Sequence, residues 1–119
     1  MLPSTPATRD LLTLDRLKGG EGNAPYFINV GRGDICPEDG LWEEAVVRGY
    51  LSGCLLDVFR EEPLPPDSAL WSCNGVTITP HVAALSFPGD VVAAFAENLA
   101  LFMTSPALLR HKVDFNAGY

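Results

Sequence analysis

Three short segments of apolar and β-branched residues alternate with segments of helical periodicity, and this alternation restricts the fold more than any other feature. The predicted strands are residues 26–30, 51–59 and 76–79. Helices are predicted over residues 37–48 and 86–103, with one or two short helical turns within residues 9–18. Strands that alternate with helices pair in parallel through right-handed crossovers, so the sequence predicts an α/β fold.

The composition excludes several classes of protein. Asp and Glu number 15 against 8 Lys and Arg, and the formal net charge is −7. Such a chain does not attract phosphate backbones, so no nucleic-acid partner is predicted. Hydrophobic residues make up 47%, which is enough for a core, but no run of 18 uncharged apolar residues occurs, and no membrane-spanning helix is predicted.

The cysteines indicate the compartment. Cys36, Cys54 and Cys73 form no C-x-x-C pair, and an odd number cannot close into a disulfide framework, so we expect reduced thiols and a cytoplasmic location. Cys54 lies in a predicted buried strand and should be inert, whereas Cys36, at a predicted helix N-terminus, should be the most reactive. No cluster of His, Cys and carboxylates has metal-ligand spacing, so no metal site is predicted.

Polar side chains follow each predicted strand. Arg32 follows the first, Asp57 and Glu62 come at and after the end of the second, and His81 follows the third. Because parallel strands end at one edge of a sheet, these residues should converge there, where such sheets bind their ligands. Taken singly, each has an ordinary structural interpretation: an arginine in a surface turn, a histidine at a strand end, or one surface acid among fifteen.

Together the residue types suit acid–base chemistry on an anionic substrate. A guanidinium between Gly31 and Gly33 can grip a carboxylate through two parallel hydrogen bonds. His81 can act as a general acid or base, and a hydrogen-bonded Glu62 would fix the orientation of its ring.

Four segments carry a family resemblance. They are residues 2–9 (LPSTPATR), 28–33 (INVGRG), 56–65 (LDVFREEPLP) and 79–84 (TPHVAA). With their spacing, they resemble the second half of the D-isomer-specific 2-hydroxyacid dehydrogenases over nearly the whole chain. The PHVAA segment and the closing Gly118-Tyr119 are most similar to the glyoxylate/hydroxypyruvate reductase branch. Ala83 and Ser86 stand where many members have glycine and threonine.

The resemblance implies a role for each candidate residue. Arg32 would bind the carboxylate of a 2-oxo acid, His81 would donate a proton to its carbonyl oxygen, and Glu62 would hold His81 in its acid form. Asp57 would hydrogen-bond the nicotinamide carboxamide of NAD or NADP, with NADPH favoured by the subgroup. Backbone near four further residues would line the cofactor: Pro3, Ser4, Gly31 and Ala83.

The resemblance also implies an incomplete enzyme. The chain corresponds to roughly the last third, starting after the fourth strand, and forms the second half of a Rossmann-type doubly wound parallel sheet with flanking helices. Residues 1–104 would belong to the dinucleotide-binding domain and residues 105–119 to a tail that returns toward a substrate domain. The glycine-rich pyrophosphate turn, the residue that selects NAD or NADP, and that substrate domain are not in this sequence.

Two functional hypotheses follow. In the first, the chain is part of an oxidoreductase that reduces glyoxylate or hydroxypyruvate; in the second, it is a truncated, non-catalytic Rossmann-like module for binding or assembly. Residues 26–30 should present an unpaired strand edge, so we expect a homo-oligomer or association with the missing N-terminal half of the enzyme. Without the pyrophosphate turn, the chain alone should neither bind NADPH tightly nor reduce glyoxylate.

Overall fold

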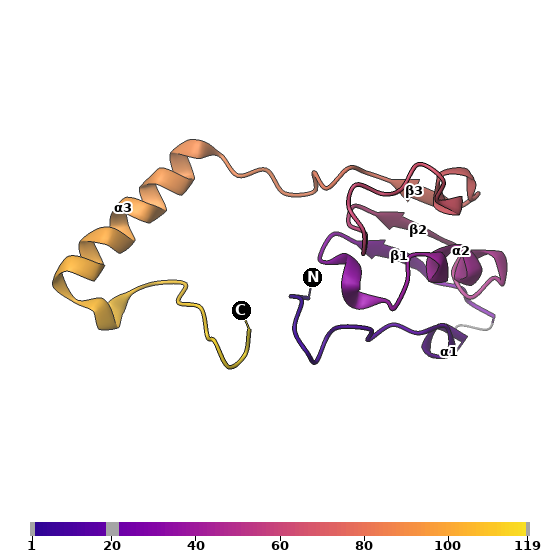
Figure 1. Ribbon diagram of the computed structural model, residues 1–119, viewed down its shortest axis with the longest axis horizontal. Coiled ribbons are helices and arrows are strands. Elements are labelled where there is room, and N and C mark those ends of the chain that lie inside the picture. Colours follow the sequence, from indigo (N-terminus) through magenta and orange to yellow (C-terminus); the bar gives the residue numbers. More distant parts are fainter. Residues whose placement is uncertain (1, 19–21, 119) are drawn as a thin grey trace. The chain divides into compact units, whose positions relative to one another are not determined.

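The computed structural model describes residues 2–18 and 22–118, and it contains a three-stranded parallel sheet (Figure 1). Strands β1 (Tyr26–Asn29), β2 (Gly53–Leu56) and β3 (Val76–Ile78) lie in the order β1-β2-β3. The prediction of a parallel α/β sheet is confirmed. Tyr119, half of the closing pair in the resemblance, lies outside the described residues.

The strands are shorter than their apolar runs. The run at 51–59 contributes only four residues to the sheet, because its neighbours β1 and β3 offer only four and three residues to pair with. Leu51, Val58 and Phe59 are buried all the same. The apolar run therefore predicts which residues are buried, whereas the length of the strand depends on the strands that pair with it.

Helix α2 (Gly40–Val47) covers the core beside the sheet. Its Leu41, Trp42 and Ala45 are buried, and the Trp42 ring stacks on Phe27 of β1 with centroids 4.6 Å apart. The helix ends at Val47, and Gly49, two residues further on, has a φ of 71° that suits a residue without a Cβ.

The predicted start of α2 is wrong. We expected Pro37 in its first turn, but the helix begins three residues later. The side chain of Asp39, next to the first turn, does not cap the helix, because its carboxylate accepts the backbone N–H of Arg60 from another segment.

The remaining helices are short or lie outside the sheet domain. α1 (Leu14–Leu17) occupies only the end of the predicted helical turns, and α3 (Pro88–Thr104) matches the predicted helix closely. Single 3-10 turns cover Gly33–Ile35, Ala69–Ser72 and Pro106–Leu108. None of the helices in the described part of the chain has the length and apolar run needed to cross a bilayer.

The chain divides into two compact units, residues 1–83 with the sheet and residues 84–119 with α3. Everything that bears on the candidate site lies in the first unit. The membership of α3 in the dinucleotide-binding domain, and of residues 105–119 in a separate tail, stays a prediction.

The expected reactivity of Cys36 is contradicted by its burial. The side chain is 0% exposed, and its thiol contacts the Gly33 carbonyl rather than the start of α2. Burial raises the pKa of Cys36 to about 12 and that of Cys54 to about 11. Cys73 is partly exposed, although burial also raises its pKa.

We therefore expect alkylation to begin at Cys73. Cys36 and Cys54 should react at least roughly 100-fold more slowly than Cys73, because a buried thiol reacts only when the fold opens. Mass spectrometry of iodoacetamide-treated protein measures the order, and the urea-unfolded chain, in which all three should react alike, is the control. Early modification of Cys36 would contradict its packing.

Candidate active site

The residues predicted to converge do meet at the carboxyl edge of the sheet. A cavity of about 410 Å³ opens there, with Arg32 from the loop after β1, Glu62 from the loop after β2, and His81 from the turn after β3. The other lining residues are Ser4, Gly33, Asp34, Phe59 and Arg60. Parallel pairing of three short strands thus brings together groups that are up to 49 residues apart in the sequence.

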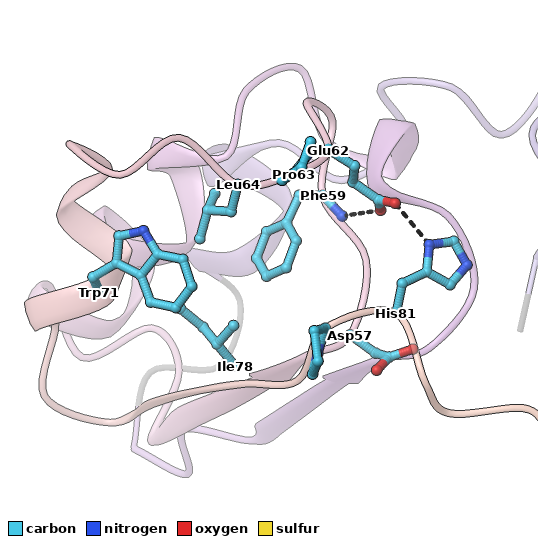
Figure 2. A pocket seen from close by; sticks show the side chains of 9 residues that line it. Asp57, Phe59, Glu62, Pro63, Leu64, Trp71, Ile78 and His81 are labelled. Carbon is cyan, nitrogen blue, oxygen red and sulfur yellow. Dashed lines mark hydrogen bonds and ion pairs between the residues drawn. The ribbon is translucent and has the colours of Figure 1, made fainter.

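Glu62 and His81 form a hydrogen-bonded pair. The Nδ1 atom of His81 lies 2.7 Å from Oε2 of Glu62, while the backbone N–H of Phe59 donates to the other oxygen, Oε1, at 2.8 Å (Figure 2). Burial raises the pKa of Glu62, but the hydrogen bonds from His81 and Phe59 outweigh it and leave the pKa below its ordinary value. The carboxylate is therefore ionised at neutral pH and accepts the Nδ1–H, which leaves Nε2 as the nitrogen available to a ligand.

The backbone of Arg32 is held in place by a neighbouring side chain, whereas its guanidinium forms no ion pair among the described residues. The Asn29 side chain accepts from the Gly31 N–H at 3.1 Å and donates to the Arg32 carbonyl at 3.0 Å, which shapes the loop after β1. Among the described residues, the guanidinium donates to the neighbouring Gly31 carbonyl alone, at 2.9 Å. In the part of the chain that the structure describes, no carboxylate pairs with Arg32.

The other charged groups of the cavity, by contrast, are neutralised. Asp34 accepts from Ser4 at 2.5 Å and pairs with Arg9 at 3.1 Å. Arg60 pairs with Asp10 at 2.7 Å and also donates to the Cys36 carbonyl. Of the two arginines that line the cavity, Arg32 is therefore the one whose guanidinium N–H groups are available to an anionic ligand.

Asp57 lies beneath the cavity rather than in its wall. It is 1% exposed and accepts from Thr79 Oγ1 at 2.5 Å and from the N–H groups of Val82 and Ala83 at 2.9 and 3.0 Å. Burial raises its pKa, but these donors outweigh it and hold the pKa of Asp57 below its ordinary value. All three bonds are to the chain itself, and a bond to a nicotinamide carboxamide stays a prediction.

The residues expected to line a cofactor surround the same edge. Gly31 lies against the Leu2 backbone so closely that a Cβ there would approach the Leu2 carbonyl to 3.3 Å, which carries Pro3 and Ser4 alongside the loop after β1. Gly31 borders a cavity of about 200 Å³, Ser4 borders the larger one, and Ala83 is exposed next to His81.

A second, apolar cavity of about 150 Å³ adjoins the Glu62–His81 pair. Phe59, Leu64, Trp71, Ile78 and Pro80 form most of its wall (Figure 2).

The sequence analysis did not single out Asn29 and Thr79, the polar residues at or just after the ends of β1 and β3. The sequence does contain a pattern that identifies them, because a polar residue at the end of an apolar strand is the same pattern that identified Asp57.

The family model for the NAD-binding domain of D-isomer specific 2-hydroxyacid dehydrogenases matches residues 1–83. Among solved structures, the NADPH-dependent glyoxylate/hydroxypyruvate reductase of Sinorhizobium meliloti, in complex with NADP and sulfate, is 37% identical, with a TM-score of 0.89 over 100% of this chain and 38% of its own. The D-isomer specific 2-hydroxyacid dehydrogenase of Xanthobacter autotrophicus Py2, in complex with NADPH and MES, is 36% identical, with a TM-score of 0.85 over 100% of this chain and 48% of its own.

A probable 2-hydroxyacid dehydrogenase from Rhizobium etli CFN 42, in complex with NADP, HEPES and L(+)-tartaric acid, is 37% identical, with a TM-score of 0.88 over 100% of this chain and 38% of its own. The chain thus spans less than half the length of each of these three structures. The family match over residues 1–83, which contain the whole convergence of Arg32, Glu62 and His81, establishes that this chain belongs to the D-isomer specific 2-hydroxyacid dehydrogenases and carries their NAD-binding domain.

Proposed function

We propose that this chain supplies the carboxylate-binding and proton-donating groups of an NADPH-dependent reductase for small 2-oxo acids, with glyoxylate or hydroxypyruvate as substrate. One observation carries the proposal: the unpaired guanidinium of Arg32 shares a cavity with the Glu62–His81 pair. A 2-oxo acid whose carboxylate binds to the Arg32 guanidinium would place its carbonyl group near the Glu62–His81 pair.

The chemistry divides among these residues. A reduced nicotinamide supplies the hydride to the carbonyl carbon when it is bound. Arg32 binds the substrate carboxylate with two parallel hydrogen bonds and orients the adjacent carbonyl. His81 gives the proton on Nε2 to the carbonyl oxygen as negative charge develops there, and the ionised Glu62 stabilises the imidazolium before the transfer. The product is the 2-hydroxy acid.

The edge of the sheet fits a planar ring cofactor. Gly31 presents backbone without a side chain beside the cavity of about 200 Å³, and Ala83 exposes only a methyl group next to His81. These residues, with Pro3 and Ser4, would hold the nicotinamide end. The structures from Sinorhizobium meliloti and Xanthobacter autotrophicus contain NADP and NADPH, which supports NADPH for this chain.

Open surfaces support an assembled form. Among the described residues β1 pairs only with β2, and α3 exposes apolar side chains such as Phe95 and Phe102. We therefore place the chain in contact with a second copy or with the amino-terminal part of a longer enzyme. The three unpaired thiols support a reducing, cytoplasmic compartment.

The proposal can be tested in a hybrid enzyme in which this chain replaces the matching 38% of the Sinorhizobium meliloti reductase. The hybrid should oxidise NADPH with glyoxylate or hydroxypyruvate. Arg32→Gln should raise KM for the 2-oxo acid roughly 10- to 150-fold, which matches the loss of a hydrogen bond to a charged group worth ~1.5–3 kcal/mol. KM for NADPH should change little. Steady-state kinetics with each substrate varied in turn measures both.

Arg48→Gln is the matched control. It removes the same charge just after the end of α2, where Arg48 pairs with Glu44 on the helix surface, and should leave both KM values unchanged. An Arg32 variant with the KM of the unmodified hybrid, or a folded hybrid without reductase activity, would contradict the proposed function.

A further inference from the structure

His81 occupies an unfavourable backbone conformation. Its φ is 53°, in the left-handed region that residues with a Cβ rarely adopt, although histidine tolerates it better than most. It comes three residues after the end of β3 and directly follows Pro80. A residue in this position keeps such a conformation only if its surroundings hold it there.

One buried carboxylate holds the turn. Asp57, the residue directly after β2, accepts the N–H of Val82 on Oδ1 and the N–H of Ala83 on Oδ2. Its backbone carbonyl accepts the N–H of His81 at 2.9 Å. Three consecutive N–H groups of the turn therefore end on Asp57.

Thr79 ties the same carboxylate to β3. Its hydroxyl donates to Asp57 Oδ1 at 2.5 Å, and its own backbone N–H donates to the Leu56 carbonyl at 3.0 Å. The Thr79 hydroxyl is the side-chain donor to Asp57 among the described residues. Without it, Oδ1 would keep only the Val82 N–H and could turn away from it.

We propose that Thr79 and Asp57 are positioning residues that lock the turn at residues 79–83 so that the His81 ring meets Glu62. The segment after β2 then fixes the pair from both sides, since the Asp57 carbonyl holds the backbone N–H of His81 and the Phe59 N–H holds the Glu62 carboxylate. The catalytic meaning of this lock rests on the proposed function, but the lock itself can be measured without turnover.

The first test uses the unmodified 119-residue chain. Val82 and Ala83 lie outside every helix and strand, yet their amide protons should exchange slowly, because a buried carboxylate accepts both. The His81 amide proton should show the strong cross-peak to its own Hα that is typical of a left-handed residue. Unprotected amides at residues 82 and 83 would overturn the proposal without any substitution.

The second test removes the hydroxyl. Thr79→Val keeps the shape of the side chain and should speed exchange at Val82 and Ala83 roughly 10- to 150-fold, as expected for the loss of one hydrogen bond to a charged group. It should also weaken the His81 cross-peak. Thr79→Ser restores a hydroxyl and should restore both signals. Thr77→Val, an exposed position of β3, is the control and should change neither.

Kinetics then connect the lock to the reaction. In the hybrid enzyme Thr79→Val should lower kcat while KM for the 2-oxo acid stays near its original value, because Arg32 is untouched. Equal effects of Thr79→Val and Thr77→Val, or of Thr79→Val and Thr79→Ser, would overturn the lock. An inactive hybrid with a normal exchange pattern would instead contradict the proposed function and leave the lock standing.

Discussion

Replacement of His81 by alanine is expected to lower kcat of the hybrid enzyme by about 10²–10⁴, the contribution of a positioned general acid. The imidazole is held by Glu62 at 2.7 Å, and among the described residues that line the cavity with Arg32, His81 is the one histidine. KM for the 2-oxo acid should change little, since the carboxylate still binds Arg32. The decrease in NADPH absorbance at saturating substrate measures kcat directly.

His111→Ala is the control for this substitution. His111 is the other histidine of the chain and shares the left-handed backbone, with φ of 54°, but it belongs to the second unit and is not among the residues that line the cavity. It should leave kcat unchanged. Glu62→Gln should lower kcat by less than His81→Ala, because it removes the support of the acid and not the acid itself. Turnover that survives in His81→Ala would remove His81 from the mechanism.

Gly33→Ala is expected to destabilise the fold by about 3 kcal/mol or more, at or beyond the upper end of the cost of overpacking. Gly33 is buried, and a Cβ there would lie 1.9 Å from the carbonyl carbon and oxygen of Phe59. These are backbone atoms, which cannot turn aside as a flexible side chain would. The loop after β1 and the segment after β2 would have to separate, and Arg32 would move away from Glu62. Urea unfolding followed by circular dichroism measures the loss.

Gly40→Ala provides the comparison. A Cβ on Gly40 would meet no atom within 4 Å, and the residue begins helix α2. Alanine is favoured over glycine in helices, so this variant should be as stable as the unmodified chain or slightly more so. A Gly33→Ala midpoint equal to that of Gly40→Ala would show that the contact between Gly33 and Phe59 is not close.

Local pattern was enough for the order and direction of the strands. Alternation of apolar runs with helical periodicity predicted the parallel sheet, and the prolines and glycines placed the ends of α3 and α2 to within a few residues. The candidate site was predictable for the same reason. Parallel strands bring their carboxyl ends to one edge, so polar residues at those ends, such as Arg32 and His81, must meet there.

Features that depend on residues far apart in the sequence were decided only by the tertiary structure. Helix α2 begins at Gly40 rather than near Pro37, and the Asp39 carboxylate accepts the Arg60 N–H instead of capping the helix. Cys36 is buried against Gly33 instead of lying at a helix N-terminus. The bonds that orient His81 join residues 19 and 22 apart, Glu62 to His81 and Asp57 to Thr79. The sequence determined by itself which elements form and which edge carries the chemistry, because periodicity and strand ends are local properties. The pairing of each buried polar group was settled only by folding, because each such group bonds to whichever donor the packed chain brings within reach.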